Sequence, residues 1–490
     1  MYDSCFGYPL FENEDFALGM DTYLRTDLVT LKNVVGLDSG NKSDSTVYLG
    51  MDYSLGLSSD FKNRNTKFYL RFERNGLYDY DAPLFIHNTL LTSAGVVERY
   101  RNKELLPQLE EFWLDAGLRD GLRFKIGLYT YEVGNGFSLN GSFENYGFTL
   151  SREWENSVLR FYYCRPDLVY KNRLGPDIPQ EAEQDIRYHH NAANFFAADF
   201  KVNLDKGYLN PYIGALVDYT SEGKRDNIFS TPVKRDILGT IGMAWNGSKG
   251  DFSFAVETAH NFGKAESADP EGKDVYHTGY LFFTDLAYQL SRITPSFQFL
   301  LCSGNEVTPE MAEDGATTLA SGKNRAFSYV SPTNINLGNS ISSVNADARP
   351  IVAMGTGYGL NYGIPRPETF FAADFDNLIM PSLGCDFQAT DKLLISVYGY
   401  YLVSFTRPVG MFEDQARYLS RELGSEVDFL LEYQLNSYTL INLLGGWFFP
   451  GRFYKEKRDD ISGSLLTPFV RGDGEANVAY QIELAAEFKF

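Results

Sequence analysis

The sequence predicts an all-β protein, a transmembrane antiparallel up-and-down β-barrel of about 18 strands with long outer loops and short periplasmic turns. Three observations carry this prediction. Apolar residues recur at every second position in many short segments, no apolar run reaches the length of a membrane-spanning helix, and the predicted connections alternate between long and short. We therefore expect one barrel domain, residues 1–490, in a bacterial cell outer membrane.

Composition limits the class of protein before any motif is considered. The 490 residues carry 44 Lys and Arg against 64 Asp and Glu, a net charge of -20, which argues against nucleic acid as a partner. Aromatic residues make up 15% and hydrophobic residues 44%, too many for a disordered chain. The sequence therefore predicts a large ordered protein.

Alternation of apolar and polar residues defines the strands. Segments 47–57, 68–72, 124–128 and 478–490 place apolar residues at alternate positions, with polar residues or glycine between them. This period of two gives a strand one apolar and one polar face. A soluble sandwich with one exposed sheet face would show the same alternation, so a second signal is needed.

The spacing of the strands supplies that signal. Every second connection is short and polar, for example Arg119-Asp120, Glu155-Asn156 and Asn436-Ser437. Short turns on one side and long loops on the other are typical of outer-membrane barrels and have no counterpart in a sandwich. Strands are expected near residues 16–27, 45–57, 66–76, 109–118, 121–131, 143–154, 157–165, 192–203, 207–219, 236–246, 251–261, 278–290, 294–302, 378–389, 391–404, 422–434, 438–449 and 476–490.

The sheet is expected to close into a barrel because it lies in the hydrocarbon of a membrane. Hydrocarbon offers no partner to backbone N–H and C=O groups, so the sheet must close and leave no edge. About 18 strands enclose an aqueous channel unless loops fill it. The stretch 303–377, rich in Gly, Ser, Asn and Thr, is expected as a long extracellular or pore-constricting loop, and the sequence leaves both placements open.

Aromatic residues near the strand ends are expected to form girdles at the two membrane interfaces. Those on the apolar side of their strands are Tyr53, Tyr163, Tyr219, Trp245, Tyr433 and Trp447. The four cysteines, Cys5, Cys164, Cys302 and Cys385, lack metal-ligand or redox spacing and are expected as isolated thiols. The first residues show no secretory signal, as in a mature chain whose leader has been removed.

Two resemblances to known proteins add to this interpretation. The last strand, ending in Phe490, resembles the C-terminal strand of bacterial outer-membrane proteins, which implies recognition by the barrel-assembly machinery. Segments 111–115 (EFWLD), 122–127 (LRFKIG), 134–136 (GNG), 423–428 (LGSEVD) and 445–451 (GGWFFPG) resemble the alginate-export family of outer-membrane channels. That resemblance implies an 18-stranded monomeric barrel that passes an anionic polysaccharide, although Leu128 stands where the family usually has arginine.

Taking the apolar face of each strand as lipid-facing leaves an inner wall that carries charge. We expect these side chains to line the pore and to set its selectivity, because charges on the wall of a narrow pore decide which ions enter. Alternatively they pair with one another and only stiffen the wall. The candidate pore-lining residues are Arg25, Arg71, Glu73, Glu111, Asp115, Arg123, Lys125, Arg160, Asp199, Lys201, Glu426, Asp428, Glu432, Glu483 and Glu487, with Glu257 and Asp285 among further acidic wall positions.

No motif for catalysis, a metal or a cofactor occurs in the chain, so we expect no enzyme and no cofactor. The predicted function is a porin-like channel for passive passage of a hydrophilic solute or oligosaccharide. Two alternatives remain: a dedicated anionic polysaccharide exporter, and a barrel that sheathes a lumenal protein partner. The expected partners are outer-membrane lipid, the assembly machinery through Phe490, and the solute or polysaccharide.

Overall fold

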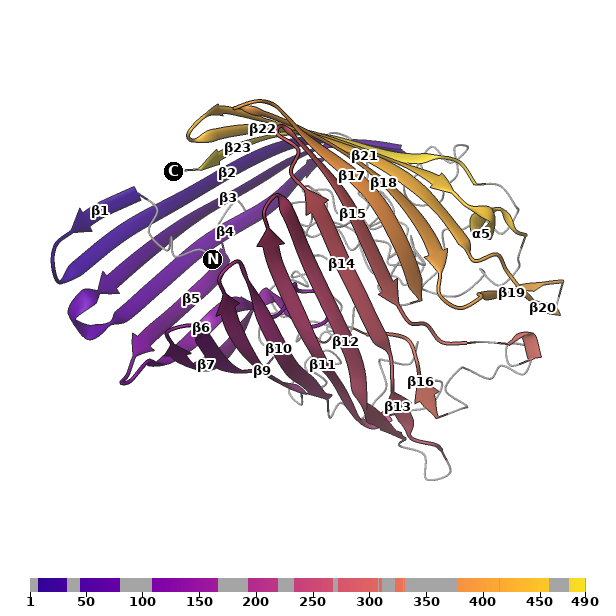
Figure 1. The fold of residues 1–490 in the computed structure, drawn as a ribbon, viewed down its shortest axis with the longest axis horizontal. Coiled ribbons are helices and arrows are strands. Elements are labelled where there is room, and N and C mark those ends of the chain that lie inside the picture. The colour runs from indigo at the N-terminus through magenta and orange to yellow at the C-terminus, as the bar shows by residue number, and fades with distance from the viewer. Residues whose placement is uncertain are drawn as a thin grey trace.

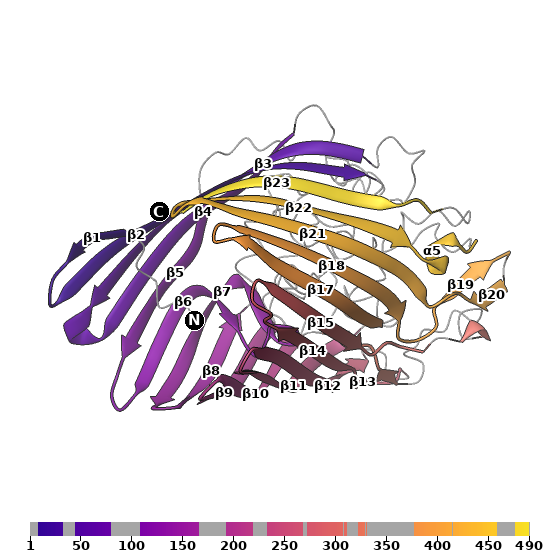
Figure 2. The same cartoon turned by 45° about the horizontal axis from the view of Figure 1, so that its top comes forward.

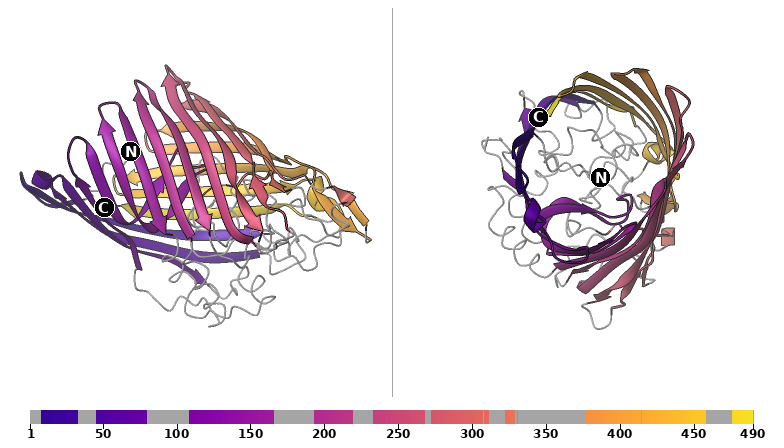
Figure 3. Two further views of the ribbon diagram at one scale, coloured as in Figure 1. Left: turned by 90° about the horizontal axis from the view of Figure 1, so that it is seen from below. Right: turned by 60° about the vertical axis from the view of Figure 1, so that its left-hand side comes forward.

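A computed structural model shows a sheet of long, tilted strands that curls into a cylinder (Figure 1). It describes residues 8–32, 45–79, 108–165, 193–218, 233–267, 272–306, 308–310, 322–328, 330, 377–413, 415–457 and 476–489. Figure 2 shows the same strands with the top turned forward, and Figure 3 looks from below and into the ring. In the described part of the chain, no helix is long and apolar enough to cross a membrane.

Eighteen antiparallel strands form the closed cylinder. Each strand pairs with the next along the chain, and β2 pairs with β23, which closes the circle. The barrel strands are β2 (Phe16–Lys32), β3 (Ser45–Phe61), β4 (Thr66–Asp79), β5 (Gln108–Gly117), β6 (Leu122–Glu132), β7 (Asn140–Trp154), β8 (Ser157–Arg165), β9 (Ala193–Leu204), β10 (Gly207–Asp218), β11 (Val233–Lys249), β12 (Phe252–Ser267), β14 (Tyr280–Tyr288), β15 (Ile293–Cys302), β17 (Leu378–Thr390), β18 (Leu393–Ser404), β21 (Glu422–Asn436), β22 (Thr439–Pro450) and β23 (Ala479–Lys489).

The remaining described elements are short and lie in the connections or, in the case of β1, before the first barrel strand. β1 pairs with the beginning of β2, and β13 pairs with β12 and with β16. A hairpin of β19 and β20 and the short helix α5 extend the connections around β21. Their bounds are β1 (Tyr8–Glu12), η2 (Lys62–Arg64), β13 (Val275–His277), β16 (Lys323–Asn324), β19 (Val409–Phe412), β20 (Gln415–Tyr418) and α5 (Arg452–Lys455).

The fold class and the strand positions predicted from the sequence are confirmed. Each expected strand overlaps one barrel strand, and the segment 157–165 matches β8 at both ends. Several strands are longer than expected, for instance β11 and β12, because pairing continues beyond the alternating segment. The short elements of the connections were not predicted, since they carry no sustained periodicity.

The tight turns explain why every second connection is short. Between β5 and β6 the backbone turns through Asp120 (φ 51°) and Gly121 (φ 75°), both in the left-handed region. Glycine reaches that region without a steric cost and aspartate does so more readily than most residues. The turn therefore reverses the chain within a few residues.

The outer surface of the barrel is apolar. Side chains that point outward from mid-strand positions are exposed and aliphatic or aromatic, such as Leu383 (69% exposed) and Ile241. Trp245 (47% exposed) and Tyr433, both predicted for the aromatic girdles, lie on this surface near the strand ends. Tyr219 lies outside the described residues. Such a surface suits a hydrocarbon solvent.

The inner surface differs from the uniformly wet wall that the alternation suggested. A cluster of buried side chains lies on the inner faces of β4 to β11, among them Trp113, Tyr131 and Phe195. The rings of Tyr131 and Tyr162 stack with centroids 4.8 Å apart. Val133, Leu139 and Val330 from two connections pack into the same cluster. Segments of two connections therefore fill part of the lumen and pack against apolar side chains of the wall.

Candidate functional site: the charged lumen

Arg25, Glu483 and Glu487 meet at the strands that close the barrel. Arg25 on β2 lies directly opposite Glu487 on β23. Its guanidinium Nη2 donates to Glu483, and its Nη1 donates to Glu487 Oε1 at 3.3 Å. The side chains are 2%, 0% and 6% exposed, and Asn442 Nδ2 also donates to Glu487 Oε1, at 3.0 Å. These three predicted lining residues therefore lie together, but they are bound to one another.

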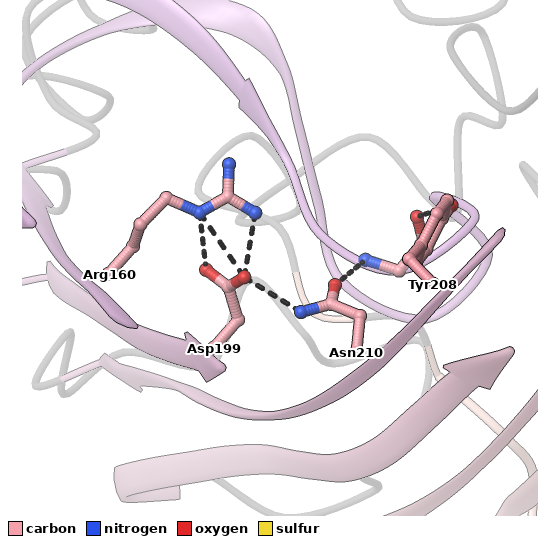
Figure 4. A network of polar contacts seen from close by, with 5 residues as sticks. Arg160, Asp199, Tyr208 and Asn210 are labelled. Carbon is pink, nitrogen blue, oxygen red and sulfur yellow. Dashed lines mark hydrogen bonds and ion pairs between the residues drawn. The ribbon is translucent and has the colours of Figure 1, made fainter. Parts of the chain in front are cut away.

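A second cluster lies on the opposite side of the lumen and includes Arg160 (Figure 4). Arg160 on β8 is paired in register with Asp199 on β9, and its Nε and Nη2 atoms donate to Asp199 Oδ1 at 3.0 Å and Oδ2 at 2.6 Å. Asn210 Nδ2 donates to Asp199 Oδ2 at 2.8 Å. Figure 4 shows one guanidinium nitrogen of Arg160 directed away from these partners. That nitrogen remains available to an anion in the lumen.

Aromatic rings hold the two lysines of the same wall. Lys125 Nζ lies 4.0 Å from the ring centre of Trp113 and 4.3 Å from that of Tyr129. Lys201 Nζ lies 3.8 Å above the ring of Tyr208, and no described carboxylate forms an ion pair with it. Cation–π contact fixes an ammonium group without neutralising it. The rings therefore hold both ammonium groups against the inner wall.

Arg123 is paired with an acid that was also predicted to line the pore. Its Nε donates to Asp115 Oδ1 at 3.2 Å, and its Nη1 donates to Asn65 Oδ1 at 3.1 Å. Arg71 and Glu111 lie opposite each other on β4 and β5, which brings these two predicted residues together as well. The side chain of Glu73 lies outside the described residues. Ion pairing is therefore present for Arg25, Arg123 and Arg160, and the role of the set in selectivity stays a prediction.

Burial divides the predicted lining residues, and Arg25 is the basic member that is buried with most of the acids. Asp199, Glu426, Asp428, Glu483 and Glu487 are buried, whereas Arg71, Arg123, Lys125, Arg160 and Lys201 retain part of their surface. Of the predicted acids with described side chains, Glu111, Asp115 and Glu432 keep similar exposure. The accessible part of the predicted wall between β4 and β9 is therefore more basic than the net charge of -20 suggests.

The segment 133–139, between β6 and β7, turns into the lumen (Figure 3, right). Phe137 and Leu139 are almost completely buried, and the Phe137 ring stacks on Phe283 of β14 with centroids 4.0 Å apart. Gly134 N donates to Asn210 Oδ1 at 2.9 Å, which links the segment to the Arg160 cluster. We call residues 133–139 the lumenal loop.

Glu257 on β12 binds the lumenal loop directly. Its carboxylate accepts hydrogen bonds from Asn135 N at 2.6 Å, Ser138 N at 3.1 Å, Ser138 Oγ at 2.9 Å and Tyr212 OH at 2.6 Å. The sequence placed Glu257 on the inner wall and singled out Gly134-Asn135-Gly136 as a motif. Their contact could not be found from the sequence, because they lie more than a hundred residues apart and the residues between them give no pairing signal.

Part of the predicted loop 303–377 also lies against the inner wall. Inward-facing Asn261 on β12 donates through Nδ2 to Ser328 O at 2.7 Å and accepts from Ser328 N at 2.8 Å. Val330 N donates to Ser138 O at 2.8 Å, so this segment touches the lumenal loop. Residues 311–321 and 331–376 lie outside the described residues. The described part contacts the inner wall, and the placement of the whole stretch 303–377 stays a prediction.

The connection between β12 and β14 carries a further buried polar group. His277 on β13 is buried, and its Nε2 lies 2.8 Å from Asp236 Oδ1 of β11. Farther out, Lys264 Nζ donates to Asp274 Oδ2 at 2.9 Å, and this hydrogen bond lowers the pKa of the Asp274 carboxyl group. These contacts fasten the connection to the barrel rim.

Comparison with known proteins establishes the class of fold. No protein-family model matches the chain, and no curated protein matches it. Among solved structures it is similar to OccK11 (OpdR) of Pseudomonas aeruginosa, with 9% identity, a TM-score of 0.51 and coverage of 100% of this chain and 99% of that chain. A BenF-like porin of Pseudomonas fluorescens Pf-5 is 9% identical, with a TM-score of 0.52 and coverage of 96% of this chain and 98% of that chain. OprD of Pseudomonas aeruginosa is 10% identical, with a TM-score of 0.51 and coverage of 96% of this chain and 93% of that chain.

These neighbours overturn the resemblance to the alginate-export family. The similar solved structures named above are OccK11, a BenF-like porin and OprD rather than alginate exporters, and at about one residue in ten identical the likeness establishes the fold. Of the segments that suggested the other family, 134–136 lies in the lumenal loop and 445–451 covers the end of β22 and the residue after it. Neither short segment outweighs the likeness of the whole fold.

Proposed function

We propose that this protein is a porin-like channel of the bacterial outer membrane, through which a hydrophilic solute passes passively. One observation carries the proposal: eighteen strands close into a cylinder whose outward side chains are apolar and whose inner wall carries charged side chains. Strands in hydrocarbon require that closure, and a charged interior has no use in a soluble core. Among the solved neighbours, a BenF-like porin and the outer-membrane protein OprD support the same conclusion.

We further propose that the channel prefers anions. The partly exposed cations Lys125 on β6, Arg160 on β8 and Lys201 on β9 lie on one wall, and Asp199 is buried beneath Arg160. A guanidinium nitrogen and two ring-held ammonium groups offer successive contacts to a carboxylate or a phosphate. The solute class supported by this wall is a small hydrophilic anion.

Purified protein in planar lipid bilayers tests both statements. Stepwise current on insertion is expected, and in a salt gradient the reversal potential should have the sign of an anion-preferring pore. Absence of current from correctly folded barrels would contradict the channel. A preference for cations would be compatible with a channel, but it would contradict the proposal that the basic wall selects anions.

The two alternative functions gain no support from the described residues. The exporter interpretation depended on the family resemblance that the solved neighbours overturn. A barrel that sheathes another protein stays a prediction, and co-purification of a lumenal partner would reveal it. Recognition of the C-terminal strand by the assembly machinery is proposed from Phe490, which lies outside the described residues.

A further inference from the structure

The lumenal loop is held by two separate kinds of contact. The apolar contact consists of Phe137 on Phe283 and of Leu139 over Gly214 of β10, where a Cβ atom would lie 1.9 Å from Leu139 Cδ1. The polar contact consists of the hydrogen bonds to Asn210 and Glu257. Apolar contacts are non-directional and leave a loop free to slide, whereas hydrogen bonds fix its position.

Glu257 provides most of the polar contact. It accepts three hydrogen bonds from the loop and one from Tyr212, although its side chain has no exposed surface. A buried carboxylate is tolerated only where donors surround it, and these donors come from the loop and from β10. The loop and the acid therefore stabilise each other.

The loop backbone is shaped to approach this carboxylate closely. Gly134 has φ 67° and Gly136 has φ 78°, so both lie in the left-handed region. A Cβ atom at Gly134 would lie 2.8 Å from Tyr212 Cε1 and 3.1 Å from Glu257 Oε2. Only glycine brings the Asn135 amide this near to the acid.

We propose that Glu257 is the positioning residue of the pore constriction: its carboxylate holds the lumenal loop at one place on the β10 to β14 wall, and thereby sets the aperture of the channel. This inference rests on the proposed function, because an aperture has a role only in a conducting barrel. Glu257 acts through the loop. Removing its acceptors releases the loop into alternative positions within an intact barrel.

Substitution of Glu257 tests the proposal by two readouts. In Glu257→Gln an NH2 group replaces one carboxylate oxygen and cannot accept the hydrogen bond from Asn135 N. Loss of a charge-assisted hydrogen bond should raise the population of displaced loop about tenfold or more. Single-channel records should then show frequent steps between current levels that the wild type rarely visits. Thr258→Val, on the same strand but on the outward face, is the matched control and should leave the record unchanged.

The second readout does not depend on conduction. In a background whose native cysteines are replaced, Val133→Cys replaces a buried residue of the lumenal loop, leaves the Phe137 stack in place and should react slowly with an impermeant thiol reagent. Adding Glu257→Gln should raise its labelling rate about tenfold or more, in parallel with the displaced population. Tyr212→Phe, which removes one donor and keeps the ring, should give a smaller increase of both signals.

The outcomes separate the inference from the proposed function. If a folded Glu257→Gln barrel shows steady wild-type-like current and unchanged labelling, the positioning role of Glu257 is overturned and the proposed channel function is retained. Faster labelling of the Glu257→Gln variant, together with no current even from the wild-type barrel, would reject the channel and retain the positioning role of Glu257. If Glu257→Gln does not fold, Tyr212→Phe and Ser138→Ala give the same comparison, and wild-type behaviour of both overturns the inference.

Discussion

Replacing Arg25 tests how the barrel closes. Arg25→Met leaves Glu483 and Glu487 buried without their shared cation, at 0% and 6% side-chain exposure. Removing one partner from a buried ion cluster costs about 3–5 kcal/mol, because a charge remains in a poorly solvated place. We therefore expect the free energy of unfolding, measured by urea titration of the refolded barrel in lipid vesicles, to fall by about that amount.

An exposed ion pair gives the control for this experiment. Lys62 Nζ lies 2.8 Å from Glu12 Oε1, and both side chains are largely solvated. Lys62→Ala should cost no more than about 1 kcal/mol. A triple variant that also carries Glu483→Gln and Glu487→Gln should regain most of the stability lost in Arg25→Met. Equal and small losses for Arg25→Met and Lys62→Ala would refute the account of a buried cluster at the closing strands.

Three further predictions concern selectivity, backbone and lipid-facing surface. Arg123→Glu with Lys125→Glu should shift the reversal potential toward cations, and an unchanged ion preference would remove both residues from the filter. Gly127→Ala should cost about 3 kcal/mol in the unfolding titration, since its Cβ would lie 2.0 Å from a backbone oxygen at φ 142°, whereas Gly399→Ala meets nothing within 4 Å and should be close to neutral. Leu383→Arg on the outward face of β17 should cost about 2–4 kcal/mol in lipid, and a neutral result would place that side chain outside the hydrocarbon.

The sequence predicts the barrel strands well because each strand has to be apolar on one side. Alternation is a local property, so segments such as 157–165 are found with their correct bounds. The short strands β13 and β16 form only because the chain folds back against β12, which leaves no periodic trace. Local patterns therefore specify the wall, and long-range contacts specify what lies within it.

The candidate site was predicted as a set of positions, and its pairings were not. Alternation correctly put Arg25 and Glu483 on one face, but their contact depends on the register with which β2 meets β23. The lumenal loop was missed for a related reason. Glu257 appears in the sequence as one acid among several, and only the three-dimensional structure brings Asn135 and Ser138 to it.

A spin-label scan along β11 in lipid vesicles tests the central claim most directly. Single spin labels are placed at residues 240 to 245 in a background without the native cysteines. Relaxation by dissolved oxygen, which concentrates in lipid, reports contact with lipid, and relaxation by a water-soluble polar agent reports contact with water. Labels at Ile241, Met243 and Trp245 should respond to oxygen, and labels at Thr240, Gly242 and Ala244 should not, because the first three point outward and the others face the interior. Equal response at all six positions would contradict a cylinder with an apolar exterior and a polar interior.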